Sequence, residues 1–122
     1  EYGIEHLHAP LLLILGHQKC GAVQAAMESY GKPQKAEKGH AKDSITEIVN
    51  KIMPAVKQAK NSAQTGDVLD NAIQGNVRNV YSELLKKSPV VKELIRSGKL
   101  KVVLAEYYLE SGEVKILDKA SE

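Results

Sequence analysis

The chain has 122 residues, of which 43% are hydrophobic and 26% are charged. This length is enough for one domain with a modest core and too short for two. The net charge of +2 argues against a nucleic-acid-binding protein, and no apolar run approaches the length that a membrane span requires. The single cysteine, Cys20, excludes a disulfide bond within the chain and favours a reducing, cytoplasmic location.

A short helix is expected over residues 1–8, with Ile4 and Leu7 as its candidate buried contacts. Leu11–Leu15 then forms a short, continuous apolar run that Gly16 ends. A run of this kind is typical of a strand that is buried on both faces in a parallel sheet. We therefore expect the first strand to lie in the interior of such a sheet.

His17 and Cys20 follow this strand with two residues between them, and Gly21–Val23 opens a segment of helical character. The pair is therefore expected at the carboxyl end of a strand, where open α/β sheets bind their ligands. A neutral imidazole and a thiolate are both good zinc ligands, and a helix N-terminus beside Cys20 would favour its thiolate form. The alternative is structural, with a small buried cysteine beside a loop histidine.

The next helix is predicted from about Cys20 to Tyr30, because apolar residues recur there at three- and four-residue spacing. Lys32–Lys42 is polar and rich in lysine, which indicates an exposed loop, and we interpret His40 within it as a solvated side chain. A capping box at Ser44–Glu47 begins another helix, which Pro54 should kink or split.

A long helix is then predicted to run to about Lys87. Its expected buried face consists of Leu69, Ile73, Val77, Val80, Leu84 and Leu85. Gly75 interrupts this pattern, and a glycine in a helix interior costs about 1 kcal/mol against alanine. We therefore expect close packing against another element at Gly75.

The C-terminal third predicts a short helix capped by Ser88, with Pro89 at its first position. Lys99–Tyr107 is mostly apolar and predicts a central strand, whereas Glu113–Leu117 alternates polar and apolar residues as an edge strand does. The order of elements predicts an α/β protein. Its sheet should be mostly parallel and flanked by helices, with a C-terminal antiparallel edge strand.

Three segments together resemble the β-class carbonic anhydrases. The stretch GHQKCGAV after an apolar strand resembles the second zinc motif of that family, and the segment before it, EYGIEHLHAP, is similar to the helix that precedes the motif. Ser88–Val114 is similar to the family's C-terminal pattern, in which a Ser-Pro helix leads to Gly-Lys-Leu, a strand, a Tyr-containing turn and a Gly-bearing hairpin. The resemblance implies the β-carbonic-anhydrase fold and the reversible hydration of CO2 to bicarbonate, which is a lyase reaction. It also implies bound Zn²⁺, with His17 and Cys20 as metal ligands.

The chain departs from the family at the other half of the zinc site. Family members take a second cysteine ligand from an upstream Cys-x-Asp-x-Arg motif, but Cys20 is the only cysteine here and no Asp-x-Arg occurs. The site is therefore expected to be incomplete and this chain alone inactive, and we assign no catalytic residue. Because Glu1 falls within a predicted helix and the sheet has few strands, we expect residues 1–122 to be a single, N-terminally truncated domain.

Two other functions remain open at this point. The chain could be a non-catalytic homologue or fragment that acts as a self-association or partner-binding module. His17 and Cys20 could also form a thiol–base dyad for nucleophilic hydrolysis, although no orienting carboxylate or oxyanion hole is evident nearby. In each case we expect a homo-oligomer, most simply a dimer, because a thin sheet leaves apolar faces uncovered.

Overall fold

The computed structural model describes residues 1–32 and 44–119. His40 and the predicted polar loop beyond Lys32 lie outside the described residues. The elements in chain order are α1 (Tyr2–Glu5), β1 (Leu11–His17), α2 (Gly21–Ser29), α3 (Ser44–Asn61), α4 (Val68–Lys87), α5 (Pro89–Arg96), β2 (Lys101–Tyr107) and β3 (Val114–Lys119). No helix in the two described ranges is both long and apolar enough to cross a membrane.

The three strands form one mixed sheet in the order β1-β2-β3. β1 pairs with β2 in parallel, with Gly16 opposite Glu106 and His17 opposite Tyr107. β2 pairs with β3 in antiparallel orientation. The predictions of a central second strand and of an antiparallel edge strand at the C-terminus are therefore confirmed.

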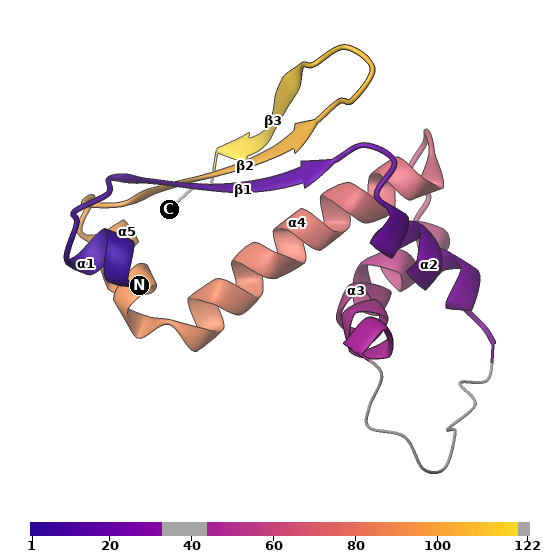
Figure 1. Cartoon of the computed structure of the whole chain (residues 1–122), viewed down its shortest axis with the longest axis horizontal. Helices are drawn as coiled ribbons and strands as arrows, with labels where there is room; N and C mark the ends of the chain where they lie inside the picture. The colour runs from indigo at the N-terminus through magenta and orange to yellow at the C-terminus, as the bar shows by residue number, and fades with distance from the viewer. Residues whose placement is uncertain (33–43, 120–122) are drawn as a thin grey trace.

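β1 is exposed on one face, so the prediction that it is buried on both is wrong. Leu11, Leu13 and Leu15 are 55%, 47% and 47% exposed, while Leu12 and Ile14 pack on the core beneath the sheet. The helices lie on one side of the sheet only (Figure 1). Within the described part of the chain, β1 is an edge strand, and no element covers its outer face.

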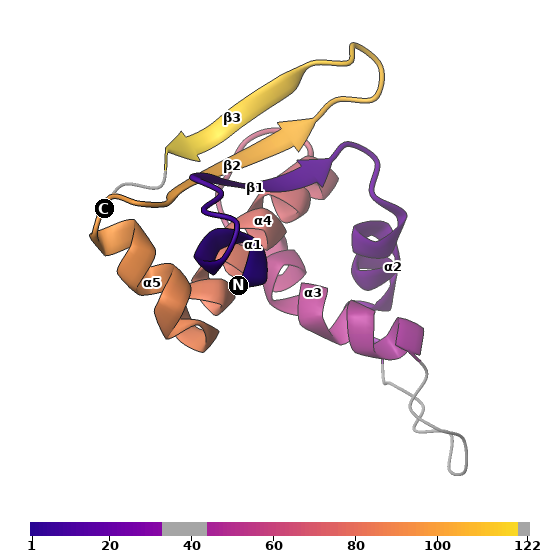
Figure 2. The same ribbon diagram turned by 60° about the vertical axis from the view of Figure 1, so that its left-hand side comes forward.

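Two clusters of buried residues form the core, and α4, which lies beneath the sheet in Figure 2, contributes to both. The first lies between α2, α3 and α4 and includes Val23, Ala26, Val56 and Ile73. The second lies between α4, α5 and β2; its members are Val77, Val91, Leu100, Val102 and Leu104. α4 therefore connects the sheet to the pair of helices that follows β1.

Two glycines lie where α4 packs against its neighbours. A Cβ added at Gly16 would lie 2.6 Å from Cγ2 of Val77, so β1 rests directly on α4 at this point. A Cβ added at Gly75 would lie 3.6 Å from the Cβ of Ala55 on α3, which is ordinary van der Waals contact. The expectation of close packing at Gly75 is confirmed.

Several local predictions can be compared with the structure directly. Ser88 caps α5 as expected, because its Oγ accepts a hydrogen bond from the backbone N–H of Val91 at 3.2 Å. Pro54 does not split α3, which is one helix with buried residues on either side of the proline. Leu7 and Val80 are 69% and 47% exposed, so their predicted burial is wrong.

Candidate functional site

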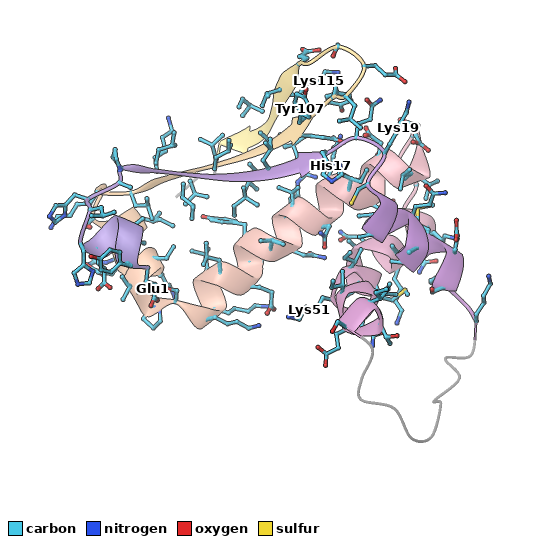
Figure 3. The ribbon with its side chains drawn as sticks, viewed as in Figure 1. Glu1, His17, Lys19, Lys51, Tyr107 and Lys115 are labelled. Carbon is cyan, nitrogen blue, oxygen red and sulfur yellow. The ribbon has the colours of Figure 1, made fainter. Side chains whose placement is uncertain are left out.

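His17 is the last residue of β1 and lies at the carboxyl end of the strand, close to the start of α2 (Figure 3). Its side chain is exposed and follows the alternation of Leu13 and Leu15, which places it on the face of the sheet away from α4. Nδ1 of its ring lies 3.1 Å from the backbone carbonyl oxygen of Gln18. The predicted position of His17 at a strand end is confirmed.

Cys20 occupies the N-cap position of α2, with an extended backbone at φ −64° and ψ 113°. Its side chain is partly buried and packs against the first core cluster. The structure thus brings both predicted residues to one turn at the carboxyl end of β1. Cys20 also contributes to packing, as the structural alternative requires.

The turn between these residues is held at two points. The backbone N–H of Gln18 donates a hydrogen bond of 2.7 Å to the carbonyl oxygen of Tyr107, which extends the β1–β2 pairing by one residue. Lys19 has a positive φ of 56°, and its ammonium group forms an ion pair of 2.5 Å with Glu110 on the β2–β3 hairpin. Both partners of that pair are more than 60% exposed, so the ion pair adds little stability.

A nitrogen and a sulfur donor suit Zn²⁺, but a catalytic zinc site needs three protein ligands and an open position. In residues 1–32 and 44–119, no three His, Cys, Asp or Glu side chains are grouped so that they could hold a metal ion. Residues 1–32 and 44–119 therefore offer two donor side chains of the right chemistry, and no third beside them.

A partly buried polar cluster lies on the opposite face of the same strand ends. Glu106 of β2 is 0% exposed, and its Oε2 accepts hydrogen bonds from Gln74 Nε2 at 3.0 Å and from the Tyr108 hydroxyl at 3.2 Å. The same two donors lie 3.3 and 3.4 Å from Oδ2 of Asp70. We refer to Asp70, Gln74, Glu106 and Tyr108 as the carboxyl cluster.

Burial, followed by a hydrogen bond shared with Asp70, raises the pKa of Glu106 to about 7. Burial and then the charges of Glu106 and Asp70 raise the pKa of Tyr108 to about 12. The sequence pattern does not identify this cluster, because Glu106 falls within a strand that is predicted to be mostly apolar. The available signal was a carboxylate inside a central strand, together with Asp70 and Gln74 four residues apart on one helix face.

The model of one protein family, described as carbonic anhydrase, matches residues 1–114 of the chain. This chain belongs to the carbonic anhydrase family. Carbonic anhydrase 2 of Mycobacterium tuberculosis is 28% identical over 118 residues, which cover 97% of this chain and 54% of that protein. The carbonic anhydrase of Mycolicibacterium smegmatis is 24% identical over 116 residues, which cover 95% of this chain and 53% of that protein. The chain thus spans about half the length of these curated relatives.

Solved carbonic anhydrases of the β class share its fold. The β-carbonic anhydrase CcaA superposes with a TM-score of 0.71 at 18% identity, over 96% of this chain and 51% of that one. The Coccomyxa β-carbonic anhydrase, solved with acetazolamide, gives a TM-score of 0.70 at 24% identity, over 96% of this chain and 50% of that one. The predicted family and the predicted α/β fold are therefore confirmed.

Proposed function

We propose that this carbonic anhydrase is a zinc enzyme that catalyses the reversible hydration of CO2 to bicarbonate, and that His17 and Cys20 are two of its zinc ligands. The observation that carries the proposal is the family match over residues 1–114, in a chain that places a nitrogen and a sulfur donor on one turn at a strand end. Zn²⁺, when bound, supplies Lewis acidity and lowers the pKa of water towards neutrality.

The hydrogen bonding of His17 suits a metal ligand. A backbone carbonyl only accepts hydrogen bonds, so the contact between Nδ1 and the Gln18 oxygen requires the proton on Nδ1. Nε2 then carries a free lone pair, which is the arrangement by which metal-binding histidines are commonly oriented. Cys20 lies at the N-cap of α2, at the positive end of that helix dipole.

His17 and Cys20 alone would not complete a catalytic zinc site. By resemblance to the family, a second cysteine ligand and an Asp–Arg pair come from a segment that residues 1–122 do not contain. We therefore propose that activity belongs to the full-length protein and that this chain alone is inactive. A non-catalytic association module is the alternative that the experiment below must exclude.

We also propose that the protein is a homo-oligomer. The exposed apolar face of β1, formed by Leu11, Leu13 and Leu15, supports this, because monomers rarely expose contiguous apolar surface of this kind. The solved relatives include two tetrameric β-carbonic anhydrases from Sordaria macrospora, one of which gives a TM-score of 0.66 at 19% identity, over 95% of this chain and 56% of that one.

The test is zinc content by elemental analysis and CO2 hydration by stopped flow, both on the full-length protein. His17→Ala and Cys20→Ser should each abolish zinc binding and activity, whereas His6→Ala, at an exposed position after α1, should leave both unchanged. Wild-type zinc occupancy in either ligand variant would refute the assignment. Zinc binding without CO2 hydration in the wild type would favour the association module.

A further inference from the structure

One buried carboxylate oxygen in the carboxyl cluster has no hydrogen-bond partner among the described residues. Glu106 is wholly buried, and its Oε2 accepts both hydrogen bonds described above. Its Oε1 is also buried and has no hydrogen-bond partner among the residues that the structure describes. A buried acceptor without a partner is costly, so this oxygen requires either a donor or a proton of its own.

Asp70 shares both hydrogen-bond donors of Glu106. Gln74 Nε2 contacts Asp70 Oδ2 at 3.3 Å and Glu106 Oε2 at 3.0 Å, and the single hydroxyl proton of Tyr108 serves both carboxyl groups. Two carboxylates held this close in a buried site repel each other unless one of them is protonated.

The elements packed against Glu106 bring few other charges to this face. β1 contributes only Leu12, Ile14 and Gly16 to it, none of which titrates. Lys115 of β3 lies opposite Glu106 in the register, but its ammonium group lies 4.5 Å from the centre of the Tyr108 ring. On α4, Arg78 follows Gln74 by one turn and is exposed.

We propose that Asp70 and Glu106 hold one proton between them, which fastens α4 to the carboxyl end of β2, and that release of this proton loosens that end of the sheet. With the proton on Glu106, its carboxyl group can donate a hydrogen bond that the Asp70 side chain accepts. Without it, two negative charges face each other at the level of Gly16, one residue before the His17–Cys20 turn. The proposal does not depend on zinc binding or on catalysis.

The direction of the pH dependence follows from the raised pKa. Glu106 keeps its proton in the folded chain up to about pH 7, whereas the unfolded chain loses it near the ordinary value of 4.5. Between these values the folded state binds more protons than the unfolded state, so stability falls as the pH rises and levels off above about 7.

The first experiment is urea denaturation of the wild type and of Glu106→Gln across this pH range. The glutamine amide can donate to Asp70 as the protonated acid does, but it does not titrate. The unfolding constant of the wild type should rise by up to about tenfold per pH unit relative to that of the variant. Glu113→Gln, an exposed position on the β2–β3 hairpin, is the matched control and should keep the wild-type dependence. Parallel curves for the wild type and Glu106→Gln would overturn the proposal.

A second measurement needs no variant that might fail to fold. The carboxyl ¹³C resonance of Glu106 should titrate near pH 7, and a midpoint at the ordinary value of 4.5 would refute the shared proton. In Asp70→Asn the midpoint should fall but stay above 4.5, because burial is the larger cause. An unchanged midpoint in Asp70→Asn would show that Asp70 does not share the proton.

The amide proton of Gln18 reports on the turn itself, because it donates to the carbonyl oxygen of Tyr107. Its protection factor, corrected for intrinsic exchange, should fall as Glu106 deprotonates in the wild type and stay constant in Glu106→Gln. Constant protection in the wild type would refute the loosening of this end of the sheet.

Discussion

Replacement of Gly16 by alanine tests the closest approach between the sheet and α4. The new Cβ would lie 2.6 Å from Val77 Cγ2 and 3.2 Å from Ile73 Cγ2, whereas carbon atoms in contact prefer about 3.5–4.0 Å. Val77 is 4% exposed, and a β-branched residue on a helix has essentially one rotamer. Either β1 or α4 must therefore move.

The expected change in the free energy of unfolding of Gly16→Ala follows from two opposing effects. Overpacking of a core costs about 1–3 kcal/mol, and the lower entropy of the unfolded chain offsets about 0.5–1 kcal/mol when glycine becomes alanine. We expect Gly16→Ala to lower the free energy of unfolding by about 1–2 kcal/mol in urea denaturation at fixed pH. Gly21→Ala is the matched control, because no atom lies within 4 Å of its added Cβ, and its effect should stay within about 0.5 kcal/mol.

A double-mutant cycle tests whether contact with Val77 causes the loss of stability in Gly16→Ala. Val77→Ala removes the nearest contact atom, so adding Gly16→Ala to that variant should cost much less than in the wild type. Equal costs in the two backgrounds, or no cost in the wild type, would refute the proposed close approach of β1 and α4.

Two further predictions concern other surfaces of the fold. Gly75→Ala should raise the free energy of unfolding by about 0.5–1 kcal/mol through helix propensity, since the new Cβ fits 3.6 Å from the Cβ of Ala55. Gly75→Leu should instead lower it by about 1–3 kcal/mol, because the larger side chain would separate α3 from α4. A thermal unfolding temperature that is higher for the leucine variant than for the alanine variant would contradict this. Light scattering should show an oligomer for the wild type, and Leu13→Lys on the exposed face of β1 should shift it towards monomer; a monodisperse wild-type monomer would remove the case for association.

The sequence predicts best those features that neighbouring residues determine. The cap at Ser88 and the start of α2 after Cys20 each depend on a few adjacent residues, and the structure agrees with them. The first strand is expected to end at Gly16, but β1 continues through Gly16 to His17. The exposure of β1 depends on which elements pack against its two faces. A run of apolar residues does not contain that information. The metal role of His17 and Cys20 stays a prediction.

The carboxyl cluster shows why part of the site could not be predicted. Gln74 and Glu106 lie 32 residues apart and meet only because α4 crosses beneath the sheet. By itself, a glutamate in an apolar strand does not show whether its side chain faces solvent or a helix. Its burial, and hence its raised pKa, is a property of the tertiary packing.

The position of α4 in both core clusters couples the two halves of the fold thermodynamically. Ile73 belongs to the cluster with α2 and α3, and Val77, about one helical turn further on, belongs to the cluster with β2 and α5. Loss of either cluster would expose apolar side chains on the same helix, so each cluster raises the cost of unfolding the other. Amide protons in the middle of α4 should therefore exchange with solvent only when the whole chain unfolds.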